Sequence, residues 1–212
     1  MTRTFLYFLI LNFLLIACSS DNTIENAETE QKIENCTYSF NESQTELNWT
    51  AYKFLRKAGV GGTFKQIDFN GTMNGTNPQK ILESLSFSIP VASVETNDPS
   101  RNKKIDSLFF GQLNNTSFLT GKVVSIGVEE AILSITMNDV TNEVKGLCTL
   151  KDNVFTFQTE IDVAEWNALN GIKSLNDACK DLHTDVENGD TISKLWSTVS
   201  IEFSTQLTKS CD

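Results

Sequence analysis

The sequence predicts an all-β fold, an eight-stranded antiparallel barrel with one or two short helices. The first observation behind this prediction is a period of two in the apolar residues, which marks strands with one buried and one wet face. The second is that tight turns such as Gly127 to Glu130 and Asn138 to Asn142 join most of these strands. The third is length, because 36–212 has the size of one domain and contains no Pro-rich or Ser-rich linker.

The predicted strands follow one another along 36–212. Long strands are predicted at Thr37 to Tyr52 and Thr63 to Met73, and another at Ser117 to Ile126 with a break near Gly121. The other five show the alternation most clearly, with apolar positions at Leu85, Phe87, Ile89 and Val91, at Leu133, Ile135 and Met137, at Val144, Gly146, Cys148 and Leu150, at Phe155, Phe157 and Ile161, and at Val199, Ile201, Phe203 and Leu207. Such a meander forms either a sandwich or a closed barrel, and we favour the barrel because closure removes exposed strand edges.

Two segments break the alternation and predict helices. Ser100 to Phe110 begins directly after Pro99 and places its large apolar residues on one face. Trp166 to Leu182 carries apolar residues at helical spacing, at Trp166, Leu169, Ile172 and Leu175. Both helices are therefore expected as insertions between strands of the barrel.

The predicted inner face of the barrel holds the candidate ligand-binding residues. Ten apolar side chains make up this set: Phe64, Phe69, Phe87, Ile89, Ile135, Met137, Phe155, Phe157, Ile201 and Phe203. Mostly apolar walls with few placed polar groups are typical of lipid sites. A barrel of eight strands is either packed solid or just wide enough for one small ligand. Two hypotheses therefore stay open: a carrier or store for an apolar or amphiphilic lipid, or a structural or interaction protein with a solid core.

The N-terminal residues have the features of an exported lipoprotein. The domain division is a signal at 1–17, a tether at 18–35 and the folded domain at 36–212. The signal combines Arg3 with an apolar run from Phe5 to Ile16, shorter than the roughly 20 residues that a spanning helix needs. Leu15-Ile16-Ala17-Cys18 resembles the bacterial lipobox, which predicts lipidation of Cys18 and anchoring in a membrane of the cell envelope. Ser19 after the lipidated cysteine favours the outer membrane, on its periplasmic or surface face.

The segment 18–35 is rich in acids and poor in large apolar residues, which predicts a flexible tether. The whole chain has a formal net charge of -10, and removal of 1–17 takes away only Arg3 and changes it to -11. Such an acidic protein has no electrostatic footprint for nucleic acid. Nor does the composition indicate a basic patch that would hold the protein flat on an anionic lipid surface.

Four cysteines remain if Cys18 carries lipid, and sequence alone leaves their three possible pairings open. If the first and last strands pair antiparallel, Cys36 lies beside Cys211. Cys148 and Cys179 then form a second disulfide by elimination. The alternative is free buried thiols.

Catalytic and metal sites have little support in the sequence. It contains no Gly-x-Ser-x-Gly elbow, no His-Glu-x-x-His zinc helix and no Gly-x-x-x-x-Gly-Lys phosphate loop. The single histidine, His183, has Asp177, Asp181 and Asp185 nearby in the sequence, a mixed set that suits a divalent metal. A solvated helix end explains the same pattern. We therefore predict no catalytic residue, no cofactor and no metal.

Three segments of the chain, in order and at matching spacing, resemble the YceI-like family and cover most of 37–161. They are Gly61 to Gly71 after Trp49-Thr50-Ala51-Tyr52, Ser88 to Thr96 followed by Arg101-Asn102 and Ile105 to Phe110, and Val144 to Leu150. The resemblance implies a lipocalin-like barrel exported to the envelope, with an apolar channel that holds a long polyisoprenoid chain. The chain departs from the family at Asn102, where an acid is usual, and at the turn Lys151-Asp152-Asn153. The helical insert around His183 is similar to that of lipoprotein relatives.

Overall fold

A computed structural model of the chain describes residues 35–212. Cys18, the predicted signal 1–17 and all of the predicted tether except Asn35 lie outside the described residues. Within 35–212, no helix is both long enough and apolar enough to cross a membrane.

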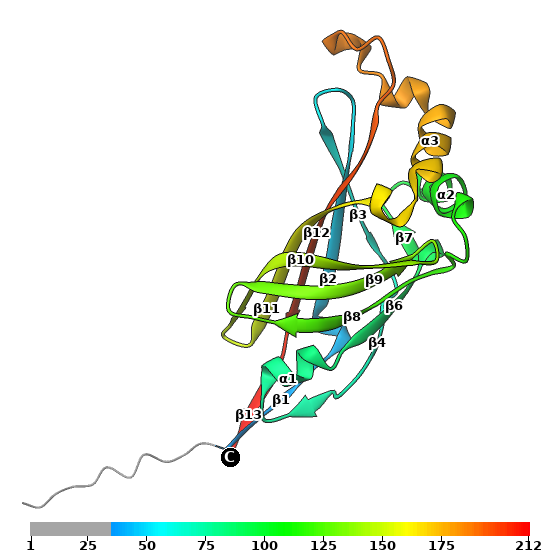
Figure 1. The fold of residues 1–212 in the computed structure, drawn as a ribbon. Coiled ribbons are helices and arrows are strands. Elements are labelled where there is room, and N and C mark those ends of the chain that lie inside the picture. Colours follow the sequence, from blue (N-terminus) through cyan, green and yellow to red (C-terminus); the bar gives the residue numbers. More distant parts are fainter. Residues whose placement is uncertain (1–34) are drawn as a thin grey trace, which may run out of the picture. The chain divides into compact units, whose positions relative to one another are not determined.

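Most of the described chain forms one curled antiparallel sheet, in the order β4-β6-β8-β9-β10-β11-β12-β2-β3-β7 (Figure 1). Its segments are β2 (Thr45–Lys53), β3 (Ala58–Phe64), β4 (Asp68–Asn70), β6 (Ser86–Pro90), β7 (Val94–Glu95), β8 (Phe118–Ile126), β9 (Glu130–Met137), β10 (Val140–Lys151), β11 (Val154–Asp162) and β12 (Leu195–Gln206). The run from β8 to β12 is the meander that the alternation predicts, with one large insertion between β11 and β12.

Two of the hairpin turns show why the meander forms. Asn138 and Asp139 join β9 to β10, and Asp152 and Asn153 join β10 to β11. All four residues have positive φ angles, between 52° and 64°. Two-residue hairpin loops need this left-handed backbone, and Asn and Asp tolerate it better than other side chains. The short polar pairs therefore set the register between β9, β10 and β11.

The barrel closes where β3 and β4 pair with β7 and β6. β4 continues β3 after a short bend, and β7 continues β6 after a 3-10 turn, Val91–Ser93. Thr63 pairs with Glu95 on one side of the bend, and Phe69 pairs with Phe87 on the other. Between them the Lys65 N–H donates to the Ser93 carbonyl at 2.8 Å. The antiparallel barrel is confirmed, although two of its eight strand paths are each broken into two segments.

The first predicted strand, Thr37 to Tyr52, is also broken. A 3-10 turn, Glu42–Gln44, separates β1 (Cys36–Ser39) from β2, and the Asn41 side chain accepts the Ser43 N–H to begin the turn. β1 leaves the barrel and lies between β5 (Asn74–Gly75) and β13 (Thr208–Cys211) in a small second sheet. Cys36 is the register partner of Cys211, and the predicted disulfide between them is present.

The second predicted disulfide is wrong, because Cys148 and Cys179 are both free and buried. Cys148 lies on β10, where its N–H donates to the Glu129 carbonyl of the β8–β9 turn. Cys179 ends α3 (Leu169–Ala178), which packs against β12 and the helical segment after α2 (Pro99–Lys104). The two thiols belong to different parts of the barrel, so the alternative of free buried thiols holds for this pair. Elimination failed because buried thiols do not have to pair.

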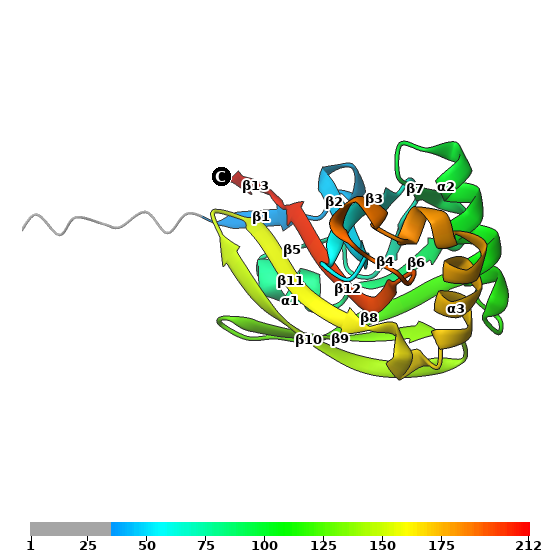
Figure 2. The same ribbon diagram turned by 90° about the horizontal axis from the view of Figure 1, so that it is seen from above.

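Both predicted helices are present and lie together at one end of the barrel (Figures 1 and 2). α2 continues through a π-helical turn, Ile105–Phe109, into a 3-10 turn, Phe110–Gln112. α3 lies among shorter 3-10 turns at Val163–Trp166, Lys180–His183 and Val186–Asn188. The Asp98 side chain accepts the N–H groups of Ser100 and Arg101 and so caps the start of α2.

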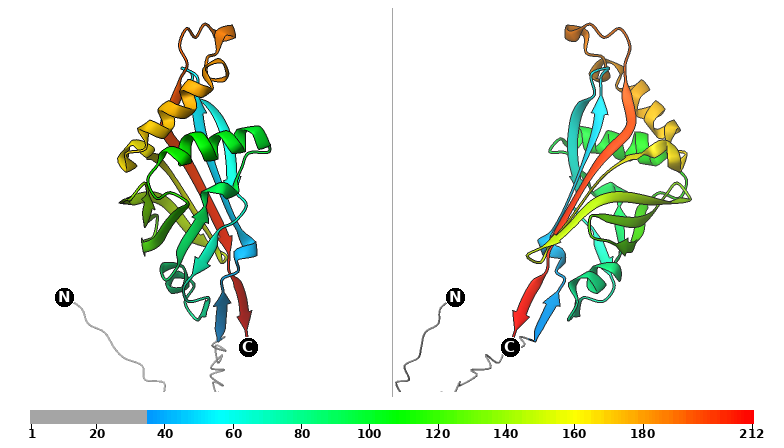
Figure 3. Two further views of the ribbon diagram at one scale, coloured as in Figure 1. Left: turned by 90° about the vertical axis from the view of Figure 1, so that its right-hand side faces the viewer. Right: turned by 60° about the vertical axis from the view of Figure 1, so that its left-hand side comes forward.

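A third helix, α1 (Pro78–Glu83), was not predicted. Its signal is the pair Asn77-Pro78: the Asn77 side chain accepts the Lys80 N–H, and proline suits the first turn. α1 lies at the end of the barrel away from α2 and α3, beside β1 and β5 (Figure 3). Its buried residues, Ile81 and Leu82, join the core there.

Candidate functional site

The barrel contains a cavity of about 450 Å³. Its wall includes all ten side chains predicted for ligand binding: Phe64, Phe69, Phe87, Ile89, Ile135, Met137, Phe155, Phe157, Ile201 and Phe203. The alternation explains this placement, because every second residue of a barrel strand faces inward. Along β2, for example, Leu47, Trp49, Ala51 and Lys53 all line the cavity. The volume lies in the lower part of the range of about 300 to 1,000 Å³ that is typical of ligand sites.

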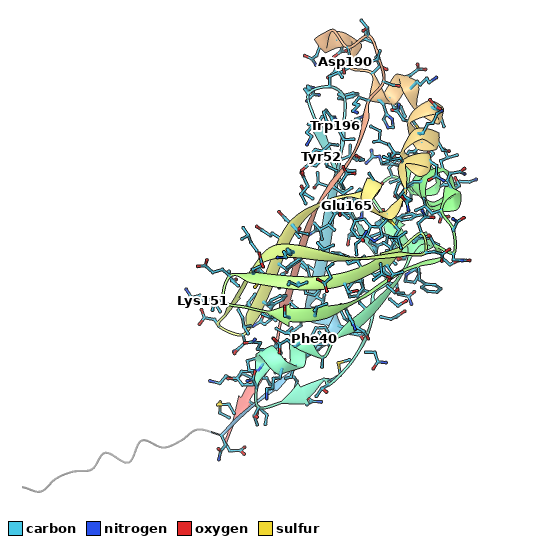
Figure 4. All side chains as sticks on the ribbon, in the orientation of Figure 1. Phe40, Tyr52, Lys151, Glu165, Asp190 and Trp196 are labelled. Atoms are coloured by element: carbon cyan, nitrogen blue, oxygen red, sulfur yellow. A yellow bond between two sulfur atoms is a disulfide. The ribbon has the colours of Figure 1, made fainter. Side chains whose placement is uncertain are left out.

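Phenylalanine rings fill one end of the cavity, which we call the closed end and define by Phe40, Phe69, Phe155 and Phe203. The ring of Phe69 lies 5.0 Å from that of Phe40 and 6.3 Å from that of Phe203, centroid to centroid. Phe155 and Phe203 are also 6.3 Å apart. Phe40 and Phe155 are buried, and Figure 4 shows Phe40 near α1. This end of the cavity is therefore lined by packed aromatic rings.

The three tryptophans of the chain also line the cavity, and the sequence prediction missed them. Each ring N–H is satisfied by a backbone carbonyl: Trp49 donates to Thr63 at 3.2 Å, Trp166 to Ile135 at 3.0 Å and Trp196 to Phe54 at 2.7 Å. The rings can therefore present apolar faces to a ligand without leaving a buried donor unpaired. The sequence could have placed Trp49 on the inner face, because Trp49 follows the alternation of β2.

The other end of the cavity is polar, and we call it the mouth. It is lined by Lys53 from β2, by Asp98, Arg101 and Lys104 from the N-cap and body of α2, and by His183 from the turn after α3. The only exposed residues of the cavity wall are Ser100, Arg101 and Leu182, and all three lie at this end. The cavity of the described domain therefore opens at the mouth.

The mouth brings cations together with few negative groups to balance their charge. The Lys53 ammonium donates to the Leu182 carbonyl at 3.0 Å, but neither Lys53 nor Lys104 forms an ion pair with another described residue. Burial lowers the pKa of Lys53, and repulsion from Arg101 and Arg56 lowers it further, against an opposing effect of Asp185. The mouth is thus a partly buried, electropositive site.

A comparison with known families matches a YceI-like domain over residues 38–207. The chain belongs to the YceI-like family. No curated protein matches the chain at a significant level. Among solved structures, a polyisoprenoid binding domain from Saccharophagus degradans has 15% sequence identity and a TM-score of 0.57, covering 82% of this chain and 98% of that domain. BcnA from Burkholderia cenocepacia has 14% identity and a TM-score of 0.53, covering 81% of this chain and 99% of that protein. At these identities the two likenesses show the fold, a YceI-like barrel.

The departure from the YceI-like pattern at Asn102 has a structural explanation. The Asn102 side-chain oxygen accepts from the Thr96 N–H at 2.9 Å and from the Thr96 hydroxyl at 2.6 Å. Its side-chain nitrogen donates to Glu95, which also pairs with Lys65. Hydrogen bonds from Lys65 and then Asn102 lower the pKa of Glu95 to about 2. Asn102 therefore ties α2 to β7 and positions Arg101 and Lys104 at the mouth of this YceI-like barrel.

His183 differs from the solvated helix end that its sequence suggests. The side chain is buried, with 9% of its surface exposed, and its Nδ1 lies 3.0 Å from the Asn176 side-chain oxygen. Burial, followed by repulsion from Lys53 and Lys104, lowers the pKa of His183 to about 4. The ring is therefore neutral at pH 7.

The acids near His183 in the sequence do not gather around it. Asp185 pairs with Arg56 at 2.6 Å, and Asp177 pairs with Lys173 and Lys180. Within 35–212, no group of three His, Cys, Asp or Glu side chains is arranged to hold a metal ion. The insert that carries His183 contributes one wall of the mouth instead.

Proposed function

We propose that this YceI-like protein binds one lipid molecule, with its apolar chain inside the barrel, and acts as a lipid carrier or store in the cell envelope. The observation that carries the proposal is the cavity: its wall is apolar from the closed end upward, and it ends at a polar mouth. A lipid chain removes apolar area from water at about 25 cal/mol per Å². The Saccharophagus degradans domain binds polyisoprenoid, which supports an isoprenoid-like ligand here.

The cavity volume limits how much of a lipid can lie inside the barrel. A water molecule takes up about 30 Å³ in the liquid, and a methylene group is of similar size. At that volume per group, a cavity of about 450 Å³ holds about 15 carbon positions. A lipid with more carbon atoms than this keeps part of its apolar length outside the cavity.

The alternative proposal is a structural or interaction protein with a solid core. A solid core leaves no room in the interior, and the cavity argues against it. Serine and threonine residues cover much of the outer barrel surface, as the alternation requires, but they do not distinguish a docking face. Lipid binding is therefore the function that the geometry supports best.

The compartment is part of the proposal and depends on Cys18, which lies outside the described residues. We propose that Cys18 is lipidated after removal of 1–17 and anchors the protein in the outer membrane. Cys18→Ala is expected to release the protein from the membrane fraction, and inhibition of lipoprotein processing by globomycin is expected to leave the protein uncut. Unchanged partitioning of the Cys18→Ala protein between membrane and soluble fractions would rule the anchor out.

Lipid binding itself is tested by native mass spectrometry of protein purified without added lipid. One bound lipid per chain is expected, because an apolar ligand in a buried channel survives purification and stabilises the fold by mass action. Phe87→Trp provides the matched variant. Phe87 lines the cavity, so a larger ring there is expected to lower lipid occupancy and leave the protein folded.

In a solid core the same substitution overpacks the interior and costs about 1 to 3 kcal/mol. A lipid-free wild type together with a strongly destabilised Phe87→Trp would therefore contradict the proposed function. Gly61→Ala is a control that adds volume outside the cavity and should change neither lipid occupancy nor stability. Gly61 is exposed on β3, and an added methyl group there meets only a backbone oxygen at 3.8 Å.

A further inference from the structure

The mouth is electropositive in a protein that is otherwise acidic. The chain has a formal net charge of -10, yet the charged residues of the cavity wall are three cations, Lys53, Arg101 and Lys104, and one carboxylate, Asp98. The composition of the chain gave no sign of this local excess. The three cations come from two separate elements, β2 and α2, that only the barrel brings together.

The one carboxylate is already occupied. Asp98 accepts two backbone N–H groups at the start of α2, and its second oxygen lies 3.6 Å from the Arg101 guanidinium. Lys53 has one carbonyl partner, and Lys104 has no ion-pair partner within 35–212. His183 is neutral and adds no charge at pH 7. An excess positive charge therefore remains at the opening.

Partly buried cations that repel one another are unfavourable unless a negative charge joins them. The repulsion is visible in Lys53, whose ionised form is disfavoured by burial and by Arg101. A lipid with its chain in the channel places its headgroup at the mouth, because the closed end is filled by phenylalanine rings. The direction of the chain and the position of the charge therefore agree.

We propose that the mouth binds an anionic headgroup, a carboxylate or a phosphate, of the lipid whose chain lies in the barrel. Lys53 and Lys104 supply the charge, and Arg101 supplies a guanidinium held in place by Asp98. This inference rests on the proposed function and deepens it, because it names the chemical class of the ligand. A neutral headgroup leaves the excess charge uncompensated, and a cationic one adds to it.

The test compares ligands that share one chain and differ only at the head. The full chain is freed of bound lipid and titrated with hexadecanoate, hexadecyl phosphate and hexadecan-1-ol below their micelle-forming concentrations. All three tryptophans line the cavity, so intrinsic fluorescence reports binding. Charge-assisted hydrogen bonds make both anions bind about tenfold or more tightly than the alcohol. The tighter anion identifies the headgroup as carboxylate or phosphate.

Two variants locate the effect at the mouth. Lys53→Met and Lys104→Met keep an unbranched apolar side chain that is one atom shorter, and they remove the charge. Each is expected to lower the affinity for the anions by about five- to tenfold and to leave the affinity for the alcohol unchanged. Lys151→Met is the matched control, because Lys151 is exposed at the β10–β11 turn, away from the cavity (Figure 4). It should change neither affinity.

Three results have distinct meanings. If the alcohol binds the wild type as tightly as the anions do, the headgroup inference is overturned and lipid binding stands. An equal loss of alcohol and anion binding in both lysine variants also overturns the inference, because a structural role for the lysines lowers all affinities. If none of the three ligands binds the wild type, the proposed function itself fails.

Discussion

The two ends of the cavity are built from opposite chemistries. At the closed end, four phenylalanine rings pack in edge-to-face or tilted pairs, and the Cys36–Cys211 disulfide joins β1 to β13 just beyond them. At the mouth, three cations and a buried neutral histidine surround an opening. Apolar packing and a disulfide stabilise a fold, whereas clustered charge opposes it. Under the proposed function, the closed end maintains the barrel and the mouth binds the headgroup.

Removing the disulfide should have the largest effect on stability. The bridge closes a loop with a sequence separation of 175 residues. Cys36→Ser combined with Cys211→Ser is expected to lower the free energy of unfolding by about 4 to 5 kcal/mol, because the unfolded chain gains entropy. Urea unfolding without reductant measures the change. A loss of less than about 1 kcal/mol would show that β1 and β13 contribute little to the barrel.

Truncating a ring at the closed end comes next. Phe155 is 4% exposed and packs against Phe203. Phe155→Ala is expected to cost about 3 to 5 kcal/mol, because the lost transfer energy adds to the energy of a new void. If urea unfolding finds a cost near that of an exposed position, such as Phe118→Ala on β8, the closed end is not the packed region that the ring contacts indicate.

The buried histidine of the mouth should make stability depend on pH. The pKa of His183 is about 4 in the folded protein and 6.5 in its ordinary state, so below pH 6.5 only the unfolded chain takes up the proton. The free energy of unfolding therefore falls as the pH decreases from 6.5 to 4, by at most about 3 kcal/mol for this group.

The control for the pH effect is His183→Gln, because carboxylates such as Asp185 also lose their pairing at low pH. The difference between wild type and variant isolates the histidine. A constant difference across pH 4 to 7 in ligand-free protein would mean that the ring is already solvated in the folded state.

Neutralising a cation of the mouth should have the smallest effect and the opposite sign. Lys53 lacks a carboxylate partner and is repelled by Arg101. In ligand-free protein, Lys53→Met is expected to leave the free energy of unfolding unchanged or to raise it by up to about 1 kcal/mol. The melting temperature should then stay the same or increase. A clear loss of stability would show that the bond from Lys53 to the Leu182 carbonyl matters more than the repulsion.

The period of two along the strands determined the barrel and its inner face. Phe157 and Phe203, for instance, were placed inside by alternation, and they are register partners on the cavity wall. The left-handed hairpin turns were likewise accessible, because Asn and Asp adopt that backbone whatever the tertiary context. The disulfide between Cys36 and Cys211 was predicted from the expected pairing of the first and last strands. Local and periodic signals were sufficient for these features.

The mouth was decided by the tertiary structure alone. Lys53 and Lys104 are far apart in the sequence, and neither their number nor their spacing sets them apart from other surface lysines. Only barrel closure and the docking of α2 bring them to one opening. His183 became buried for the same reason, and Cys148 and Cys179 stayed apart because β10 and α3 meet different neighbours. Periodicity determines which face of a strand is buried, but the position of one element against another depends on packing over the whole domain.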